Sequence, residues 1–430
     1  MTVITSSSKT GTVSVSAYDT MLLGPKILYF FAFLQQFSFY GFRSVFFKSY
    51  FLYSPFQTGT IYSASAAASF VGMAAWSNAA DSTRKPKMIF MILVMGSLIT
   101  FMSLFLKSLF EGKSYSFLLV LSVICLYSFF NFGMNPILSH TVLEILNEAG
   151  EVDKSIYGRQ VVFGSFAYII SNFCQGYATD IFGIESIFII FLLSTLMLIF
   201  AVIYAFPSDT KTTTSTEKTL ESKKAKSDDL IVPPWWHVLR SPRFVLFLTV
   251  IFLTGCARSI MSAFLPIYCK ENLKLTGLAS SLVLISGVTL EMMSFAMAPM
   301  VSGLGPYWML VMAQMIMAVR AWAYVYVPAN SSNFLVFLLI ELLKGAAFGL
   351  THLAGVRIAR ESAPEGLEAT AQGFYEGFYA QIPAIISVPL GGMAIVAFGF
   401  ERLFKYTAIG ISFSCALVIF IFWQNGKLRI

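Results

Sequence analysis

The feature that most constrains this chain is its series of long apolar stretches, separated from one another by mostly short polar segments. A membrane-spanning helix needs about 20 mostly apolar residues, and twelve stretches of the 430-residue chain meet that need. Only 12% of the residues are charged, whereas about 25% are charged in a typical soluble protein. The sequence therefore predicts an all-α polytopic membrane protein with twelve transmembrane helices.

The predicted spans divide into two groups of six around one long polar segment, which contains SDTKTTTSTEKTLESKKAKSDD and then PPWWH. We expect a disordered cytosolic tail at 1–24, an N-terminal six-helix bundle at 25–206, a cytosolic linker at 207–242, a C-terminal six-helix bundle at 243–424 and a cytosolic tail at 425–430. The spans are expected near 26–50, 56–79, 88–107, 116–139, 158–180, 185–206, 243–268, 276–301, 307–327, 332–356, 369–397 and 400–424.

The distribution of basic residues predicts how the chain is oriented in the membrane. If the N-terminus is inside, eighteen of the 29 Lys and Arg residues lie on the inner side, seven lie on the outer side and four lie within the spans. Basic residues collect in cytoplasmic loops, so both termini are expected in the cytosol, with the protein in the plasma membrane or an organelle membrane. The net charge of +7 then reflects topology and indicates no nucleic-acid partner.

Two segments of the chain resemble each other at a fixed offset. GYATDIFGIESIFII begins at Gly176 and GMAIVAFGFERLFKY begins at Gly392, an offset of 216 residues, and six positions agree between them. The pair FG at 132–133 recurs at 348–349 with the same offset. Two six-helix units in the same orientation are parallel repeats, an arrangement of transporters that bind substrate at mid-membrane between the halves.

Several motifs carry a more specific resemblance. The loop SNAADSTRKPK provides an aspartate and basic residues (Asp81, Arg84 and Lys85), although the usual glycines are replaced, and YGRQVVFGSFAYII, MAVRAWAY and ELLKGAAFGLTHLAG follow along the chain. In these segments the chain resembles the major facilitator superfamily, especially the branch of the lactose permease and the nucleoside:proton symporters. The resemblance implies the major facilitator fold, a monomer, and a gate that Asp81, Arg84 and Lys85 form on the inner side.

Charged residues inside apolar spans are costly and often functional. The C-terminal half has six of them, which we assign to proton coupling: Arg258, Glu291, Arg320, Glu341, Lys344 and Glu376. We expect Arg320 to have carboxylate partners across the bundle, so that a movement relative to Glu291 or Glu341 loads or unloads a proton. Static ion pairs between helices are the alternative. The sequence leaves open which carboxylate carries the proton, and uniport is also open.

The N-terminal half has fewer charges and more amides. Gln36, Tyr40 and Arg43 share one helical face, Asn131 and Asn135 are one turn apart, and Gln372 and Tyr375 form a polar stripe in the other half. The amide and hydroxyl groups among these residues suit a hydroxyl-rich solute. For Asn131 and Asn135, hydrogen bonding between helices is an equally good explanation. The resemblance implies a substrate role for Gln36, Arg43, Asn135, Glu144 and Arg159; the last two have solvated loop positions as the alternative.

The sequence has no motif of a membrane enzyme or an ATP-driven pump. It has three scattered His residues, five Cys residues without a CxxC pair, and no GxxxxGK[ST] loop, so we expect no enzymatic activity, cofactor or metal. The predicted function is secondary active transport of a small polar organic solute, sugar or nucleoside-like, with protons as the expected second partner. The alternatives are a proton-driven exporter of a metabolite or drug and a non-transporting receptor or scaffold.

Overall fold

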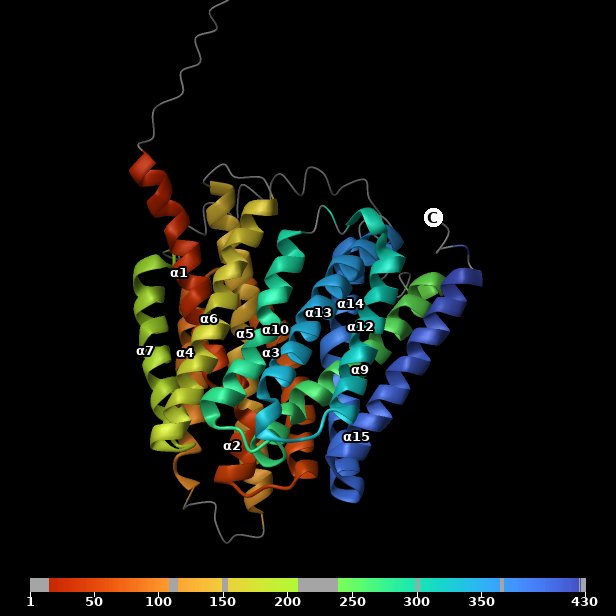
Figure 1. The fold of residues 1–430 in the computed structure, drawn as a ribbon. Coiled ribbons are helices and arrows are strands. Elements are labelled where there is room, and N and C mark those ends of the chain that lie inside the picture. Colours follow the sequence, from red (N-terminus) through yellow and green to blue (C-terminus); the bar gives the residue numbers. More distant parts are fainter. Residues whose placement is uncertain are drawn as a thin grey trace, which may run out of the picture.

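The computed structural model describes residues 15–107, 115–148, 154–207, 239–297, 300, 302–363, 367–424 and 426. Within these ranges the chain is helical and contains no strand. The longest helices run side by side along one common direction, and the N-terminal and C-terminal halves lie next to each other (Figure 1). Most of the expected linker and the C-terminal tail fall outside the described residues.

The N-terminal half forms helices that follow the expected spans, with two differences. The helices are α1 (Val15–Tyr40), α2 (Arg43–Tyr50), α3 (Pro55–Thr83), α4 (Pro86–Ser103), α5 (Ser116–Glu148), α6 (Lys154–Phe182) and α7 (Ser186–Ala205). Residues 15–24, expected in the disordered tail, lie in α1. Ala17, Met21 and Leu22 are good helix formers, and the helix continues through Gly24 and Pro25 into the apolar stretch. The span expected at 26–50 is interrupted at 41–42, where Gly41 lies so close to Asn172 of α6 that a Cβ would overlap its side chain.

Local sequence sets the ends of α3. Ser54 and Gln57 form a capping box, in which Ser54 Oγ accepts from the Gln57 N–H at 3.2 Å and Gln57 Oε1 accepts from the Ser54 N–H at 2.9 Å. Pro55 occupies the first helical position, which needs no N–H donor. Arg84 ends the helix in the left-handed conformation, with φ of 54°. These signals fix where the chain turns on both sides of the span.

The C-terminal half contains longer helices and more irregular turns. The elements are α9 (Pro242–Glu271), α10 (Gly277–Ala296), η3 (Ser302–Leu304), α12 (Pro306–Tyr326), η4 (Ser331–Asn333), α13 (Phe334–Ser362), α14 (Glu368–Glu376), the π-helical turn η5 (Gly377–Gln381) and α15 (Ile382–Gln424). Gly399, with φ of 81° and ψ of 174°, interrupts α15. A continuous helix of that length would extend about 65 Å, more than twice the apolar thickness of a bilayer of about 30 Å.

Eight of the described helices are long and apolar enough to cross a membrane, and one of these segments, Thr370–Gln424, runs through the break at Gly399. The helices α1, α3 and α6, which were also predicted to be spans, are not among them. Their buried faces contain polar side chains such as Gln35, Ser65 and Asn172, which lower their hydropathy. The structure is thus all-helical with many apolar helices, and the division into twelve spans stays a prediction.

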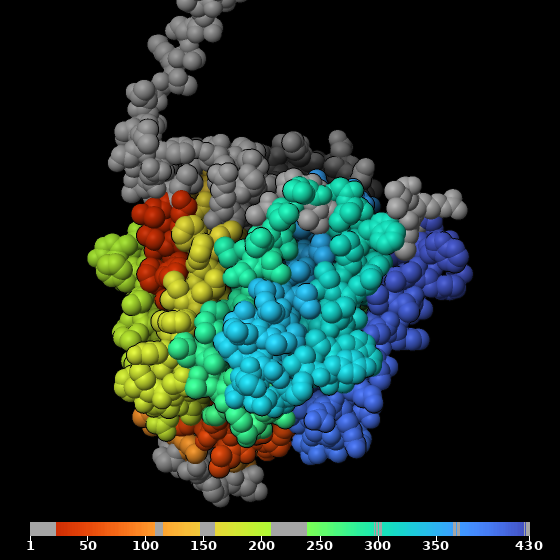
Figure 2. Space-filling view, viewed as in Figure 1, coloured from red at the N-terminus to blue at the C-terminus, as the bar shows by residue number. Residues whose placement is uncertain are grey.

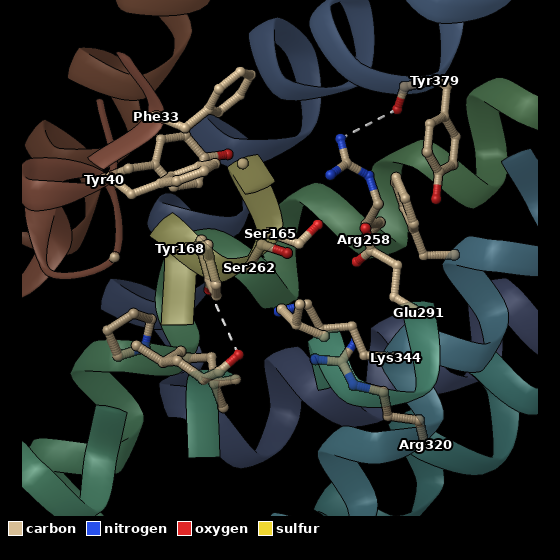
Figure 3. A pocket seen from close by; sticks show the side chains of 18 of the residues that line it. Phe33, Tyr40, Ser165, Tyr168, Arg258, Ser262, Glu291, Arg320, Lys344 and Tyr379 are labelled. Atoms are coloured by element: carbon tan, nitrogen blue, oxygen red, sulfur yellow. Dashed lines mark hydrogen bonds between the residues drawn. The ribbon is translucent and has the colours of Figure 1, made fainter. Parts of the chain in front are cut away.

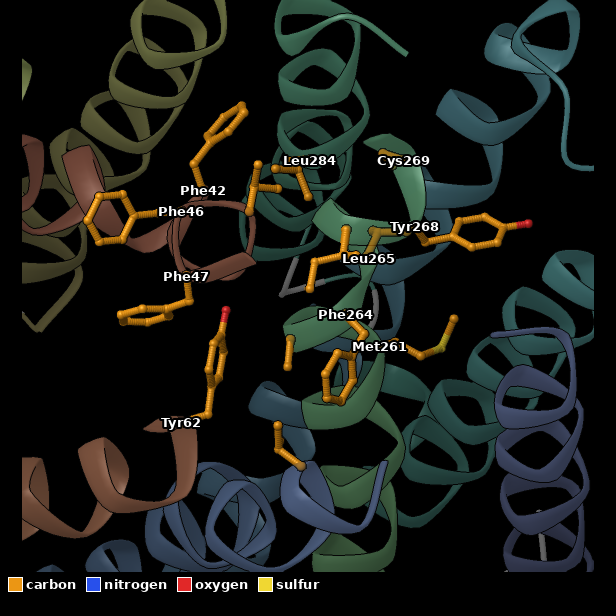
Figure 4. Packing of buried hydrophobic residues seen from close by; sticks show 14 of the residues in the cluster. Phe42, Phe46, Phe47, Tyr62, Met261, Phe264, Leu265, Tyr268, Cys269 and Leu284 are labelled. Atoms are coloured by element: carbon orange, nitrogen blue, oxygen red, sulfur yellow. The ribbon is translucent and has the colours of Figure 1, made fainter. Parts of the chain in front are cut away.

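The buried hydrophobic residues form one shared core at one end of the molecule and two separate cores at the other. The shared core includes Phe46 of α2, Tyr62 of α3, Phe264 of α9 and Leu284 of α10, which pack together in Figure 4. A second cluster lies within the C-terminal half, in α9, α12, α13, α14, η5 and α15. A third lies within the N-terminal half, mainly in α1, α3, α4, α5 and α7. The two halves are therefore joined by apolar packing mainly at the end where α2 lies.

Polar contacts reinforce the same end. Lys48 of α2 donates to Glu271 of α9 at 2.6 Å. The carboxylate of Asp180 accepts from the N–H groups of Gly277 and Leu278 at 2.5 and 2.8 Å, so a residue of α6 caps the start of α10. The helices α6, α10 and α13 pack side by side along one face of the molecule (Figure 2). These contacts close one end of the boundary between the halves.

Candidate functional site

A central cavity lies between the two halves of the chain. Its volume is about 370 Å³, which is in the range of small-molecule sites, about 300–1,000 Å³. Figure 3 shows aromatic side chains of α1 on one side and charged side chains of α9, α10 and α13 on the other. The lining residues are Phe33, Phe37, Tyr40, Gly41, Val161, Gly164, Ser165, Tyr168, Arg258, Ser262, Leu265, Pro266, Leu284, Val288, Glu291, Met317, Arg320, Lys344, Phe348 and Tyr379.

The N-terminal wall of the cavity is aromatic. Phe33, Phe37 and Tyr40 recur at intervals of four and three residues, so they share one face of α1. The rings of Phe37 and Tyr168 meet edge to face with centroids 4.8 Å apart. Tyr168 of α6 also donates to the carbonyl oxygen of Leu284 at 3.5 Å, across the boundary between the halves. This wall offers flat apolar surfaces with hydroxyl groups at their edges, which suits the face of a ring.

The C-terminal wall is charged. Arg258, Glu291 and Lys344 all line the cavity, and none of them forms an ion pair with any residue that the structure describes. Arg258 Nη2 is 3.5 Å from the carbonyl oxygen of Tyr379, and its guanidinium carbon is 4.8 Å from the centre of that ring. These three groups therefore have hydrogen-bonding capacity left for a ligand or a proton.

A close contact between two helices and a π-helical turn lie beside these charged groups. A Cβ at Gly345 would overlap the carbonyl oxygen of Gly287, so only glycine allows α13 to approach α10 this closely. That approach brings Glu291 and Lys344, which are neighbours of the contact, to the same part of the cavity wall. Tyr379 lies in the π-helical turn η5, a kind of irregularity that is frequent at functional sites.

Arg320, which lines the cavity, and Glu341, which does not, form a separate, fully buried pair. Glu341 Oε1 accepts from Arg320 Nη2 at 2.7 Å, from Arg320 Nε at 2.9 Å and from the Tyr324 hydroxyl at 2.7 Å. Both side chains are 0% exposed. Glu341 Oε2 is buried without a hydrogen-bond partner among the described residues. Arg320 thus has the carboxylate partner across the bundle that the sequence predicted, although its role in proton coupling stays a prediction.

Comparisons with known proteins agree with this architecture. Residues 22–406 match the MFS_1 like family. The chain belongs to this family. The expected resemblance to the major facilitator superfamily is thereby confirmed. No curated protein matched the sequence.

Solved structures of other transporters share the fold of this MFS_1 like protein. A crystal structure of the nucleoside transporter NupG matches with a TM-score of 0.76 at 14% identity, over 94% of this chain and 99% of that one. Tetrameric PepTSo2 matches with a TM-score of 0.64 at 12% identity, over 96% of this chain and 100% of that one. A POT family transporter in complex with a conjugated peptide gives a TM-score of 0.64 at 13% identity, over 95% and 97%. At these identities the matches show the fold alone.

The structure brings five of the predicted site residues to the central cavity: Tyr40, Arg258, Glu291, Arg320 and Lys344. Gln36, Asn131 and Asn135 instead form a contact between α1 and α5. Gln36 Nε2 donates to Asn135 Oδ1 at 2.8 Å and to the carbonyl oxygen of Asn131 at 3.2 Å. Asn135 thus hydrogen-bonds between helices through its side chain, whereas Asn131 does so through its main chain and has its side-chain Oδ1 buried without a hydrogen-bond partner among the described residues. A role of these residues in ligand binding stays a prediction.

The predicted residues of α14 lie outside the central cavity. Tyr375 is 0% exposed, packs against Phe247, has its hydroxyl 3.3 Å from His352 Nδ1, and is not among the residues that line the cavity. Its predicted contact with a solute stays a prediction. Gln372 donates to Glu376 at 3.1 Å, and Glu376 is exposed. Tyr375 is therefore buried while Glu376 is exposed, and Tyr379 in the following turn η5 lines the central cavity.

Two further candidates lie near the ends of α5 and α6. Glu144 Oε2 is 3.6 Å from Nδ1 of His140 on the same helix, and it does not line the central cavity. Arg159 belongs to the described backbone of α6, but its side chain is outside the described set. The structure therefore gives no contact between these two residues and the cavity.

The residues of the expected gate motif lie where α3 turns into α4. Asp81, Arg84 and Lys85 are exposed. Asp81 and Lys85 form no ion pair with a described residue. The neighbouring Lys87 donates to the carbonyl oxygens of Ile203 and Phe206 at 3.2 and 3.1 Å, and so binds the end of α7. A gating role for the motif stays a prediction.

Sequence reasoning missed the aromatic and hydroxyl part of the cavity. Phe33 and Phe37 precede Tyr40 on its helical face, and Ser165 and Tyr168 follow Val161 at intervals of four and three residues. These periodic patterns were available in the sequence, but they are also typical of core or lipid-facing side chains. Among the described residues, no group of His, Cys, Asp and Glu could hold a metal ion.

Proposed function

We propose that this protein is a secondary active transporter that moves a small polar organic solute, sugar or nucleoside-like, by alternating access between two six-helix bundles. The main support is the central cavity of about 370 Å³, which residues of both halves line. Aromatic rings lie on one side, and charged groups lie on the other, three of them without an ion-pair partner among the described residues. The proposal keeps the twelve spans, the boundaries at 25–206 and 243–424, and the cytosolic termini as parts of one hypothesis.

The arrangement of the cores supports alternating access. The halves share a core at the end where α2 and the start of α10 lie, and they have separate cores at the other end. With both termini in the cytosol, the shared end faces outward and the structure is the inward-facing state. Rocking of the halves around the cavity would break the contacts at the shared end and form new ones at the other, since packed interfaces change between discrete arrangements.

Proton coupling is proposed to act through Glu291. Glu291 lines the cavity and forms no ion pair with a described residue, whereas Glu341 is held by Arg320 and Tyr324. A carboxylate in a cavity can exchange a proton with water and with a ligand, and Lys344 and Arg258 line the same cavity. Solute binding would then favour one protonation state of Glu291, and this preference couples the movement of the proton to the movement of the solute.

The test is transport by the purified protein in sealed vesicles. Vesicles would be exposed to sugars, nucleosides and small acids, with recordings of internal pH and of counterflow of each radiolabelled compound. The nucleosides are included because a structural neighbour is a nucleoside transporter. We expect one compound class to change the internal pH, and the change to be lost in Glu291→Gln while counterflow remains.

Two results would contradict parts of this proposal. Counterflow without any pH change in wild-type vesicles would mean uniport, and would remove the role of Glu291. No counterflow of any compound, with protein that is folded and inserted, would favour a non-transporting receptor or scaffold.

A further inference from the structure

A second, smaller cavity adjoins the central one and is positively charged. Its volume is about 100 Å³, enough for several waters or for one ion of the size of phosphate. It shares Tyr40, Arg258 and Ser262 with the central cavity. The remaining lining includes Arg43 of α2 and Gln381 of η5, so both halves of the chain contribute to this smaller cavity as well.

The two arginines of the smaller cavity have no anionic partner. No Asp or Glu lines this cavity, and neither Arg43 nor Arg258 forms an ion pair with a described residue. The Nε atoms of both are buried and have no hydrogen-bond partner among the described residues. The Arg43 guanidinium lies between two rings, with its central carbon 4.2 Å from the centre of Tyr40 and 3.6 Å from that of Tyr62. Stacking of this kind fixes the guanidinium and leaves its edge for an anion.

Hydroxyl groups complete the donor set. Ser259 is 6% exposed, lines the cavity, and its Oγ has no hydrogen-bond partner among the described residues. Ser262 and the amide of Gln381 line the same space. Buried polar atoms are rarely left without a partner in a folded protein. A set of two guanidinium groups, hydroxyls and an amide is the chemistry that binds an oxyanion.

The charge balance of the joined cavities points the same way. Arg320 is neutralised by Glu341. Among the described residues, the other cations that line the two cavities are Arg43, Arg258 and Lys344, and the only carboxylate is Glu291. An excess of buried positive charge is costly unless an anion compensates it.

We propose that the smaller cavity is a binding site for a small oxyanion, held by Arg43 and Arg258 with Ser259 as a further donor. The oxyanion has two possible sources, a free inorganic ion or the acidic group of the transported solute, whose organic part would then occupy the central cavity. Binding at this site goes beyond the proposed function, because an equilibrium binding measurement gives its result whether or not the protein transports anything.

The first experiment measures thermal unfolding of the purified full-length protein in nanodiscs, with increasing sodium phosphate at constant ionic strength. We expect a saturable rise of the unfolding temperature for the wild type. In Arg43→Gln the apparent Kd for phosphate should rise at least about ten-fold, and in Ser259→Ala about three-fold, because charged and neutral hydrogen bonds are lost. Arg402→Gln is the matched control, since Arg402 is exposed and lines neither cavity.

Two outcomes would overturn the proposal. One is a shift that does not saturate in the wild type. The other is a saturable shift of equal size, with equal Kd, in Arg43→Gln and in the control. If Arg43→Gln does not fold, Ser259→Ala and Arg43→Lys decide the question, since both keep the size of the cavity nearly unchanged.

Comparison of probes distinguishes the sources of the oxyanion. Acetate provides a carboxylate alone, and benzoate provides a carboxylate with a ring that fits beside the aromatic wall. Binding of benzoate at least about ten-fold tighter than acetate, and weakened in Phe37→Ala, would indicate the acidic group of a solute. Binding of phosphate tighter than either, and unchanged in Phe37→Ala, would indicate a free inorganic ion.

Discussion

The two groups of charge in the C-terminal half differ in how they are satisfied. Arg320 and Glu341 are both 0% exposed, although Arg320 belongs to the cavity lining. Glu341 accepts two hydrogen bonds from Arg320 and one from Tyr324. Arg258, Glu291 and Lys344 line the cavity and have no ion-pair partner among the described residues. The charges of Arg320 and Glu341 compensate each other, whereas Arg258, Glu291 and Lys344 can still bind a ligand or a proton.

This difference separates a role in stability from a role in transport. Breaking a buried ion pair is strongly destabilising, because one charge is left without compensation. A charge in a water-accessible cavity costs less to neutralise, and its removal should be felt when a ligand or proton binds. The sequence alone shows only that all five residues lie in apolar spans, so the comparison depends on the positions of the side chains.

The largest effect is expected from breaking the buried ion pair between Arg320 and Glu341. Arg320→Gln leaves the Glu341 carboxylate buried with little compensation, and should lower the free energy of unfolding by about 3–5 kcal/mol. Thermal unfolding of the purified protein would measure this loss, with Arg402→Gln as the matched exposed control. The double variant Arg320→Met/Glu341→Leu should recover much of the loss, because neither charge is then left alone.

One result would contradict a purely structural role for the Arg320–Glu341 pair. If Arg320→Gln unfolds at the wild-type temperature but abolishes proton-coupled uptake, the pair belongs to the transport machinery, as the sequence first suggested.

The next effect concerns the contact between α10 and α13, which lies beside Glu291 and Lys344. A Cβ at Gly345 would overlap the carbonyl oxygen of Gly287, and the main-chain nitrogen of Glu291 lies close by. Gly345→Ala should therefore force α13 away from α10 and cost about 1–3 kcal/mol of stability. Gly410→Ala is the matched control, because no atom lies within 4 Å of its added Cβ, and it should be neutral or slightly stabilising. Equal unfolding temperatures for both variants would show that the contact is adaptable.

The sequence was sufficient for much of the fold but for less of the site. Apolar length predicted the membrane-spanning class, and the span expected near 56–79 lies within α3. The break between Tyr40 and Arg43 was missed. The close approach of Gly41 to Asn172 at this break involves a residue far away in the sequence. Charges within spans identified Arg258, Glu291 and Lys344. Which of them are paired could not be predicted, since pairing depends on how α10, α12 and α13 are rotated against one another.

The third effect is expected on transport with little change in stability. Glu291→Gln keeps the size of the side chain and breaks no ion pair with a described residue, so unfolding should change by less than about 1 kcal/mol. Accumulation of the solute against a gradient should fall at least about ten-fold, equivalent to about 1.4 kcal/mol of coupling. Uptake driven by an imposed pH gradient measures this, and counterflow of the same solute is the internal control. Loss of counterflow together with accumulation would mean that Glu291 binds the solute and not only the proton.

The smallest effect is expected from breaking the ion pair between Lys48 and Glu271, which is partly exposed to solvent. Lys48 and Glu271 lie 2.6 Å apart at the shared end, and their side chains are 29% and 40% exposed. Lys48→Ala should therefore cost no more than about 1 kcal/mol of stability, and raised salt should diminish even that difference. Thermal unfolding at low and high salt would measure it, with Lys85→Ala as an exposed control that breaks no described ion pair. A loss as large as that of Arg320→Gln would show that pairing alone, and not burial, makes a charge structural in this protein. A small loss, combined with faster labelling of cysteines placed at the shared end, would mean that the exposed pair contributes to the balance between the two states and the buried pair to the fold.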